Sequence, residues 1–168
     1  EYFGRGPAEN YLDRNAGSMI GLYKSTAEEL YFPYVRPQEN GHHTDTRWVS
    51  LSTGKKGLLI QADNTIGFNA LRNSIEDFDD EEATGLPRQW SNFTPEQVAN
   101  HDEAAAKSVL RRQHHINDIT PRDFVEVCVD LKQQGVAGYD SWGSRPEPAY
   151  TLPANREYNW GFTLIPLK

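Results

Sequence analysis

Cysteine is almost absent from the sequence, since Cys128 is the single one among 168 residues. A lone cysteine cannot form a disulfide within the chain, so a disulfide-stapled fold is excluded. Cys128 lies between Val127 and Val129, in an apolar run where a free cysteine packs as a small apolar residue. We therefore expect Cys128 to be buried in the core rather than to act as a catalytic thiol. The cysteine count leaves both the bacterial cytoplasm and the periplasm open.

The sequence also lacks an excess of basic residues. It has 17 Lys and Arg against 24 Asp and Glu, which gives a net charge of -7. Such a chain has no general basic face for a phosphate backbone, so we expect no nucleic-acid partner. No apolar run is long enough to span a membrane. The sequence starts at Glu1 without Met, and we interpret it as a fragment. Neutral sugars, small molecules and proteins remain as partners.

Most of the sequence has the pattern of β-strands separated by turns. Residues 158–164 alternate apolar and polar side chains, which predicts a strand with one buried face and places Trp160 in the core. Residues 124–129 are mainly apolar on both faces, as in a strand inside a sandwich. Further strands are predicted at 48–51, 57–60 and 66–71, the first two forming a hairpin around 53–56.

One segment has the pattern of a helix instead. Thr94 matches a helix-capping residue, and Pro95 suits the first helical position. Gln97 matches the capping-box partner of Thr94. The residues up to Arg112 are rich in Ala, Glu, Lys and Arg, so we predict a helix over 94–112. The sequence as a whole predicts an all-β, antiparallel fold with one short helical insertion, in a single domain over 1–168.

Three longer motifs follow one another in the sequence. Residues 3–11 are Phe-Gly-Arg-Gly-Pro-Ala-Glu-Asn-Tyr and are followed by Asp13 and Arg14. Residues 34–41 are Tyr-Val-Arg-Pro-Gln-Glu-Asn-Gly, and residues 138–143 are Gly-Tyr-Asp-Ser-Trp-Gly. In this order the motifs resemble the C-terminal, small-chain domain of β-galactosidases of glycoside hydrolase family 2. The resemblance covers nearly the whole chain, and three long motifs in order make it specific.

The resemblance implies an antiparallel β-sandwich similar to the supersandwich of galactose mutarotases. It also implies that the chain is only the later part of that sandwich, and that the catalytic barrel lies elsewhere. No residue of this chain then inherits a catalytic glutamate. The chain departs from the family at Gln134, where Met is usual, at Ala137, where Gly is usual, and over 79–110, which looks like an insertion.

The acidic residues of the motifs are candidates for turn stabilisation. Glycoside hydrolysis needs two carboxyl groups at a set separation, and the sequence shows no such pair. Glu9, Glu39 and Asp140 each lie in a motif rich in Gly or Pro. We predict that their oxygens accept hydrogen bonds from backbone N–H groups in tight turns. We therefore expect no catalytic residue in this chain.

Trp142 is the candidate for contact with a sugar. An indole offers a large flat surface for the apolar C–H face of a sugar ring, and its N–H can donate a further bond. The small neighbours of Trp142 let a loop project its side chain. The resemblance implies that Trp142 packs against substrate, on the aglycone side of the galactoside pocket, and that Asp140 orients the loop. The alternative is a core tryptophan that pins the loop.

The histidines and arginines suggest no cofactor. Adjacent histidines, as in 42–43 and 114–115, point to opposite faces of a strand, and no zinc-site spacing is present. We therefore expect neither a metal nor another cofactor. Arg5 and Arg14, which lie close to acidic residues in the sequence, are expected to form structural ion pairs or to bind a neighbouring domain.

Several functions are compatible with these patterns. The chain can be a non-catalytic domain of a β-galactosidase, in which the complete enzyme hydrolyses terminal β-D-galactosides while this chain supplies Trp142 and contacts to the catalytic barrel. It can instead be a stand-alone carbohydrate-binding module. A mutarotase-like epimerase would use Glu39 with His42 or His43. A purely structural domain would serve contacts between domains or the subunits of a homo-oligomer, through apolar surface left exposed. The exact galactoside and the oligomeric state stay open.

Overall fold

The computed structural model describes residues 1–78, 116–140 and 142–168, which belong to two compact units. The first unit comprises Glu1–Phe32, Asn40–Leu71 and Val125–Lys168, and the second Pro33–Glu39 and Arg72–Phe124. The helix predicted over 94–112 lies outside the described residues. Within the described ranges, no helix has the length and apolar character needed to cross a membrane.

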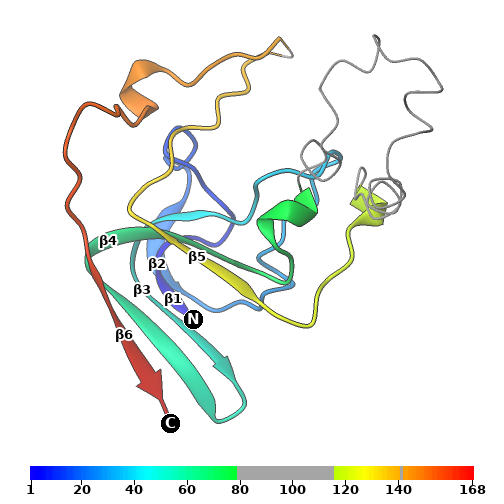
Figure 1. Cartoon of the computed structure of the whole chain (residues 1–168), viewed down its shortest axis with the longest axis vertical. Helices are drawn as coiled ribbons and strands as arrows, with labels where there is room; N and C mark the ends of the chain where they lie inside the picture. Colours follow the sequence, from blue (N-terminus) through cyan, green and yellow to red (C-terminus); the bar gives the residue numbers. More distant parts are fainter. Residues whose placement is uncertain (79–115, 141) are drawn as a thin grey trace, which may run out of the picture. The chain divides into compact units, whose positions relative to one another are not determined.

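The first unit is built on a six-stranded antiparallel sheet (Figure 1). The strands are β1 (Tyr2–Gly6), β2 (Met19–Tyr23), β3 (His43–Thr53), β4 (Lys56–Leu71), β5 (Glu126–Asp130) and β6 (Phe162–Leu167). They follow the order β2-β1-β3-β4-β5, and β6 also pairs with β4. All pairs are antiparallel. The prediction of an all-β, antiparallel fold is confirmed, and the sheet is consistent with one layer of a sandwich.

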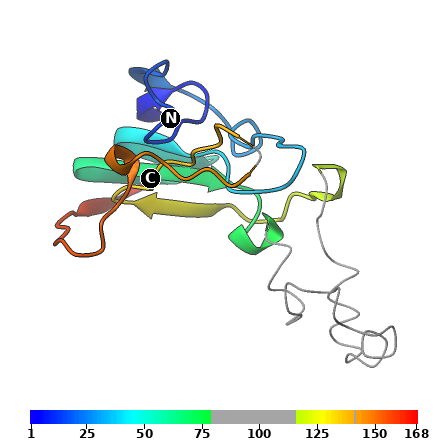
Figure 2. The same ribbon diagram turned by 90° about the horizontal axis from the view of Figure 1, so that it is seen from above.

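Strands β3 and β4 form the predicted hairpin. Thr53 pairs with Lys56, and Gly54 in the turn has φ of 61°, a left-handed conformation that glycine adopts without strain. Strand β4 has 16 residues and contacts β3 along one edge. Its other edge is shared, because its first part pairs with β6 and its last part with β5. Figures 1 and 2 both show β5 running beside β4.

The core of the first unit lies on one region of this sheet. The last six residues of β4, Ile66–Leu71, are all buried. The Tyr2 ring meets Phe68 edge-on at 5.1 Å between centroids, and His43 stacks on Phe68 at 5.3 Å. The remaining members of the buried cluster are Val49, Ile60, Ile66 and Ala70. The core therefore ties β1, β3 and β4 together.

Two predictions about the ends of the sheet are wrong. Cys128 is only partly buried, because it lies on β5, the last strand in the sheet order, whose five residues are all half-buried. Trp160 is 46% exposed and precedes the first residue of β6, Phe162. All six residues of β6 are exposed. Alternation shows which residues share a face of a strand, but another layer must cover that face to bury them.

The second unit contains one buried carboxylate among its described residues, that of Asp77. Asp77, in the 3-10 turn η1 (Ile75–Phe78), pairs with the Arg122 guanidinium and accepts the Ser74 N–H at 3.1 Å. Burial alone would raise the pKa of Asp77, but the hydrogen bonds from Arg122, Asn73 and Ser74 outweigh it and lower that pKa below 3.8. This carboxylate is therefore ionised at neutral pH and holds together segments distant in the sequence. The other described short turns of the chain are η3 (Ile116–Asp118) and, in the first unit, η4 (Pro148–Tyr150).

Candidate functional site

The loop that carries Trp142 projects its side chain into solvent. Trp142 is 93% exposed, so the alternative of a core tryptophan does not hold within the described residues. The Trp142 N–H donates to Asp140 Oδ1 at 2.7 Å. This is the bond of an Asx turn, in which a carboxylate fixes the backbone two residues further on. The predicted turn role of Asp140 is confirmed, and the bond fixes the backbone at Trp142.

Three residues in or next to the same loop have a left-handed backbone conformation. Gly138 has φ of 98° and Gly143 has φ of 84°, and both lack the Cβ that would strain this conformation. The Gly138 N–H donates to Ser144 Oγ at 3.3 Å across the mouth of the loop. Ala137 has φ of 57°, so it occupies a conformation that suits glycine, the residue usual at this position in the family that the sequence resembles. The loop turns sharply at both ends.

The base of the loop is attached to Asp13, which follows the first motif. The Val136 N–H donates to Asp13 Oδ1 at 3.1 Å, and the Ala137 N–H donates to Asp13 Oδ2 at 2.7 Å. Gly135 packs so closely on this carboxylate that an added Cβ would lie 2.5 Å from Oδ2. The Gly135 N–H donates to the Tyr150 carbonyl at 2.7 Å. The carboxylate that follows the first motif thus holds the residues just before the third motif, far away in the sequence.

The first and second motifs meet at a carboxylate. Glu9 is buried and accepts the Gly41 N–H at 2.7 Å, while Arg14 donates to its other oxygen at 2.5 Å. The predicted turn role of Glu9 and the predicted structural ion pair of Arg14 are both confirmed. The corresponding role of Glu39 stays a prediction. The Glu9 carboxylate is therefore engaged inside the first unit.

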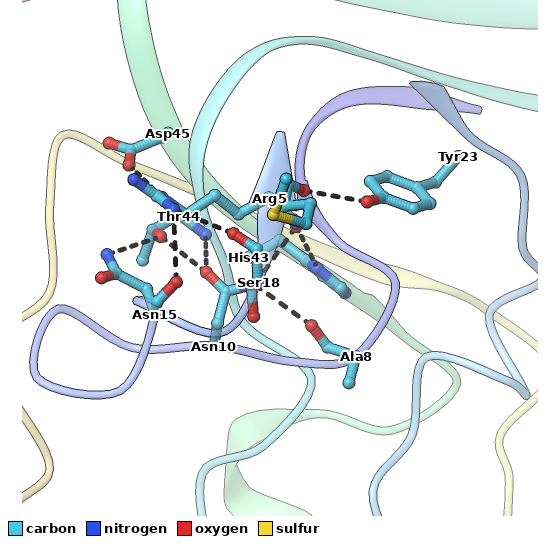
Figure 3. Close-up of polar contacts among 10 residues, drawn as sticks. Arg5, Ala8, Asn10, Asn15, Ser18, Tyr23, His43, Thr44 and Asp45 are labelled. Carbon is cyan, nitrogen blue, oxygen red and sulfur yellow. Dashed lines mark hydrogen bonds and ion pairs between the residues drawn. The ribbon is translucent and has the colours of Figure 1, made fainter. Parts of the chain in front are cut away.

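Arg5 organises a third set of contacts, drawn in Figure 3. Its Nε donates to Asp45 at 2.6 Å, and Nη1 donates to the carbonyls of Asn15 and Ser18 at 3.2 and 2.9 Å. His43 Nδ1 lies 3.1 Å from the Arg5 carbonyl. Arg5 therefore forms a structural ion pair, as predicted, with Asp45 as the partner. The contacts hold the segment after Arg14 against β1 and β3.

Removal of the Glu9 carboxylate is expected to destabilise the first unit. Glu9→Ala leaves the Gly41 N–H buried without its partner, which costs about 1–3 kcal/mol. Urea unfolding of the chain at pH 7.5, followed by circular dichroism, measures the free energy of unfolding. Glu157→Ala is the matched control, because that glutamate is exposed and surface changes stay within about 0.5 kcal/mol. Equal midpoints for Glu9→Ala and the control would contradict the role of Glu9.

The adjacent histidines are buried in the first unit. His42 and His43 have exposed fractions of 0% and 1%. Burial, with a contribution from His43, lowers the pKa of His42 from 6.5 to about 4, and burial also lowers the pKa of His43. In the described part of the chain, neither ring nitrogen of His42 has a hydrogen-bond partner. Rings so enclosed do not face a sugar, which argues against the epimerase hypothesis.

Among the residues that the structure describes, no group of three or more His, Cys, Asp or Glu side chains is arranged so that it could hold a metal ion. A cavity of about 770 Å³ does lie within the first unit, beside residues 63–65 of β4. Its lining combines the ring of Trp160 with polar side chains from several segments. The polar lining includes Asp63, Asn64, Lys132, Arg156 and Asn159. An aromatic ring among several hydrogen-bonding groups makes this cavity a candidate small-molecule site.

Comparison with known proteins gives one consistent result. Residues 1–164 match the family model described as β-galactosidase small chain. A β-galactosidase of Priestia megaterium is 35% identical over 167 residues, covering 99% of this chain and 13% of the relative. A β-galactosidase of Streptococcus thermophilus is 29% identical over 168 residues, again 99% of this chain and 13% of the relative. The chain therefore spans only a small part of these relatives, and it belongs to the β-galactosidase small-chain family.

Proposed function

We propose that this chain is a non-catalytic domain of a β-galactosidase that hydrolyses terminal β-D-galactosides. In this proposal it presents Trp142 to the aglycone side of the galactoside, with Asp140 orienting the loop. The observation that carries the proposal is the nearly complete exposure of Trp142 on a loop fixed at its base. A large indole exposed in this way gains free energy only when a partner covers it.

The loop contacts make Trp142 suited to binding a sugar. The Asp140 carboxylate fixes the backbone at Trp142, and the Asp13 carboxylate fixes the start of the loop. A side chain whose backbone is already ordered loses less entropy when a ligand binds. A flat indole then covers the apolar face of a sugar ring, and the catalytic groups act from elsewhere in the enzyme.

Three acidic residues in or beside the motifs are occupied with structural contacts, which supports a non-catalytic role. Glu9 is held by Arg14 and by the Gly41 N–H, and Asp140 is held by the Trp142 N–H. Asp13 binds two further backbone amides. A general acid and a nucleophile must face the glycosidic bond across a set gap, and these carboxylates face their own backbone.

Exposed apolar side chains on β2 and β6 support contacts with the rest of a larger enzyme. Apolar surface of this kind on a folded unit marks a region that another protein surface covers. The catalytic domain of the same enzyme is the proposed partner, and a second copy of the chain is the alternative. The side chains are Met19, Ile20 and Leu22 on β2, and Leu164, Ile165 and Leu167 on β6.

A sugar titration of the isolated chain tests the accessory role. Tryptophan fluorescence is followed while galactose and lactose are added, after circular dichroism has verified the β-sheet. We expect no saturable change, because one aromatic contact without the rest of a pocket does not offset the entropy lost on association. No hydrolysis of lactose is expected either.

A stand-alone carbohydrate-binding module is the second candidate function. The cavity lined by Trp160, Asp63 and Asn64 favours it, because it combines an aromatic ring with polar groups. A saturable fluorescence change in the isolated chain would support this candidate and overturn the accessory role. Loss of that change in Trp142→Ala would place the sugar at the loop, and loss in Trp160→Ala would place it in the cavity.

A further inference from the structure

We propose that Asp13 is a positioning residue that directs the loop of Trp142 toward the aglycone of the substrate. The inference rests on the proposed function, because it assigns to Asp13 an effect on substrate that is exerted through Trp142. Asp13 itself follows the first motif, whereas Trp142 belongs to the third. The Asp13 carboxylate therefore joins two segments that lie far apart in the sequence.

The first step is the pair of hydrogen bonds at the start of the loop. The two Asp13 oxygens each accept one bond, from the successive N–H groups of Val136 and Ala137. Successive backbone amides that point to one anion form a concave cradle for negative charge. A carboxylate in this cradle fixes the direction in which the chain leaves the sheet.

The second step is the strain at Ala137. Its φ of 57° is unfavourable for a residue with a Cβ, at a cost of about 1–2 kcal/mol. The short bond from the Ala137 N–H to Asp13 Oδ2 stabilises this conformation. An intrinsically unfavourable backbone conformation persists only where the surrounding contacts stabilise it. Without the carboxylate, Ala137 is expected to leave the left-handed region and to redirect the residues that follow.

The third step is the firm attachment of Asp13. The backbones of Tyr11 and Arg14 bridge each other around it, with the Arg14 N–H donating to the Tyr11 carbonyl at 2.8 Å. Tyr11 is 1% exposed, and Arg14 pairs with the buried Glu9. Asp13 thus stands on a turn that is tied to the interior of the unit. The interior, the turn and the Asp13 carboxylate form one chain of contacts that ends at Val136 and Ala137, where the loop of Trp142 begins.

The test uses the complete β-galactosidase that contains this chain, with lactose as substrate. Asp13→Ala is expected to raise KM about 3- to 10-fold, the effect of losing one or two net hydrogen bonds. The kcat should change less than about two-fold, because no group on the reacting atoms is removed. A substrate with a small aglycone, methyl β-galactoside, should show little change in KM.

Gly135→Ala is a second variant that acts on the same contact from the opposite side. Its Cβ would displace the Asp13 carboxylate, so a similar rise in KM for lactose is expected. Asp123→Ala is the matched control, since the Asp123 side chain is exposed and lies in the second unit, outside the loop. The KM of the control should equal that of the parent enzyme.

A double-mutant cycle with Trp142→Ala separates positioning from general damage. If Asp13 acts through Trp142, then Asp13→Ala adds nothing to KM once Trp142 is gone. An undiminished effect in the Trp142→Ala background would overturn the positioning role. Unchanged KM in Asp13→Ala and Gly135→Ala, together with raised KM in Trp142→Ala, would also overturn it and leave the proposed function standing. Unchanged KM in Trp142→Ala would overturn both.

Discussion

Trp142→Ala in the complete β-galactosidase is expected to raise KM for lactose roughly 10- to 100-fold, the loss of about 1.5–3 kcal/mol of burial against sugar. The stability of the enzyme should not change, because Trp142 is 93% exposed and packs against no core of the described residues. Steady-state kinetics gives KM and kcat, and a thermal melt verifies that the fold is intact. The KM of Trp142→Phe should lie between that of the parent enzyme and that of Trp142→Ala, since phenylalanine keeps a smaller flat ring.

Tyr139→Ala and Trp160→Ala are the matched controls for this measurement. Tyr139 is an exposed aromatic residue on the same loop, and Trp160 is an exposed tryptophan outside it. If the loop presents Trp142 specifically, both controls keep the parent KM for lactose to within about two-fold. A KM for Trp142→Ala equal to that of the parent enzyme would remove the main support for the proposed function. An equal rise in KM for Tyr139→Ala would indicate that the whole loop surface, rather than one ring, contacts substrate.

Acidification is expected to destabilise the first unit between pH 6.5 and 4, through His42. The pKa of His42 is about 4 in the fold and 6.5 in its ordinary state, so the unfolded chain takes up the proton first. Stability is therefore complete above pH 6.5 and is lost as the pH falls toward 4. The pKa difference corresponds to about 3 kcal/mol at the acidic end of this window. Chemical unfolding of the chain at several pH values measures the loss.

His42→Met is the variant that isolates this effect. Methionine is apolar, fills irregular space and carries no proton, so about 3 kcal/mol of the pH-dependent loss should disappear. Burial also lowers the pKa of His43, which leaves a residual loss in the same window. The pKa of Asp77 is below 3.8, so its contribution is lost only at lower pH. An identical pH dependence in the parent chain and in His42→Met would show that His42 is not responsible.

Local patterns were sufficient to predict several parts of the fold. The β3–β4 hairpin was predicted because two largely apolar segments flank a short turn that contains Gly54. The turn roles of Glu9 and Asp140 were predicted because a carboxylate among Gly and Pro finds unpaired backbone amides nearby. The hairpin and the Asp140 turn depend on neighbouring residues in the sequence, whereas Glu9 accepts its N–H from Gly41, 32 residues away, which the local pattern did not identify.

Features that depend on distant segments could not be predicted in this way. The Asp13 carboxylate was visible beside the first motif, but its partners at Val136 and Ala137 come from the other end of the sequence. The single signal for this contact was Ala137 at a position where glycine is usual in the family. Trp160 was placed in the core because of alternation, and Cys128 because it lies in an apolar run. No described layer covers β6, however, and β5 lies at the end of the sheet.

The divided edge of β4 has a consequence for how the first unit folds. The same edge must pair with both β5 and β6. It pairs with β5 at Phe68 and Val129 and with β6 at Leu59 and Ile165, and long stretches of chain separate β4 from both partners. Pairing between distant segments is slow, because the entropy of closing the loop is lost before the contacts form. Until β6 arrives, the backbone groups from Gly57 to Ala62 present an open strand edge to any other chain. During synthesis this edge is therefore open to aggregation until β6 pairs with it.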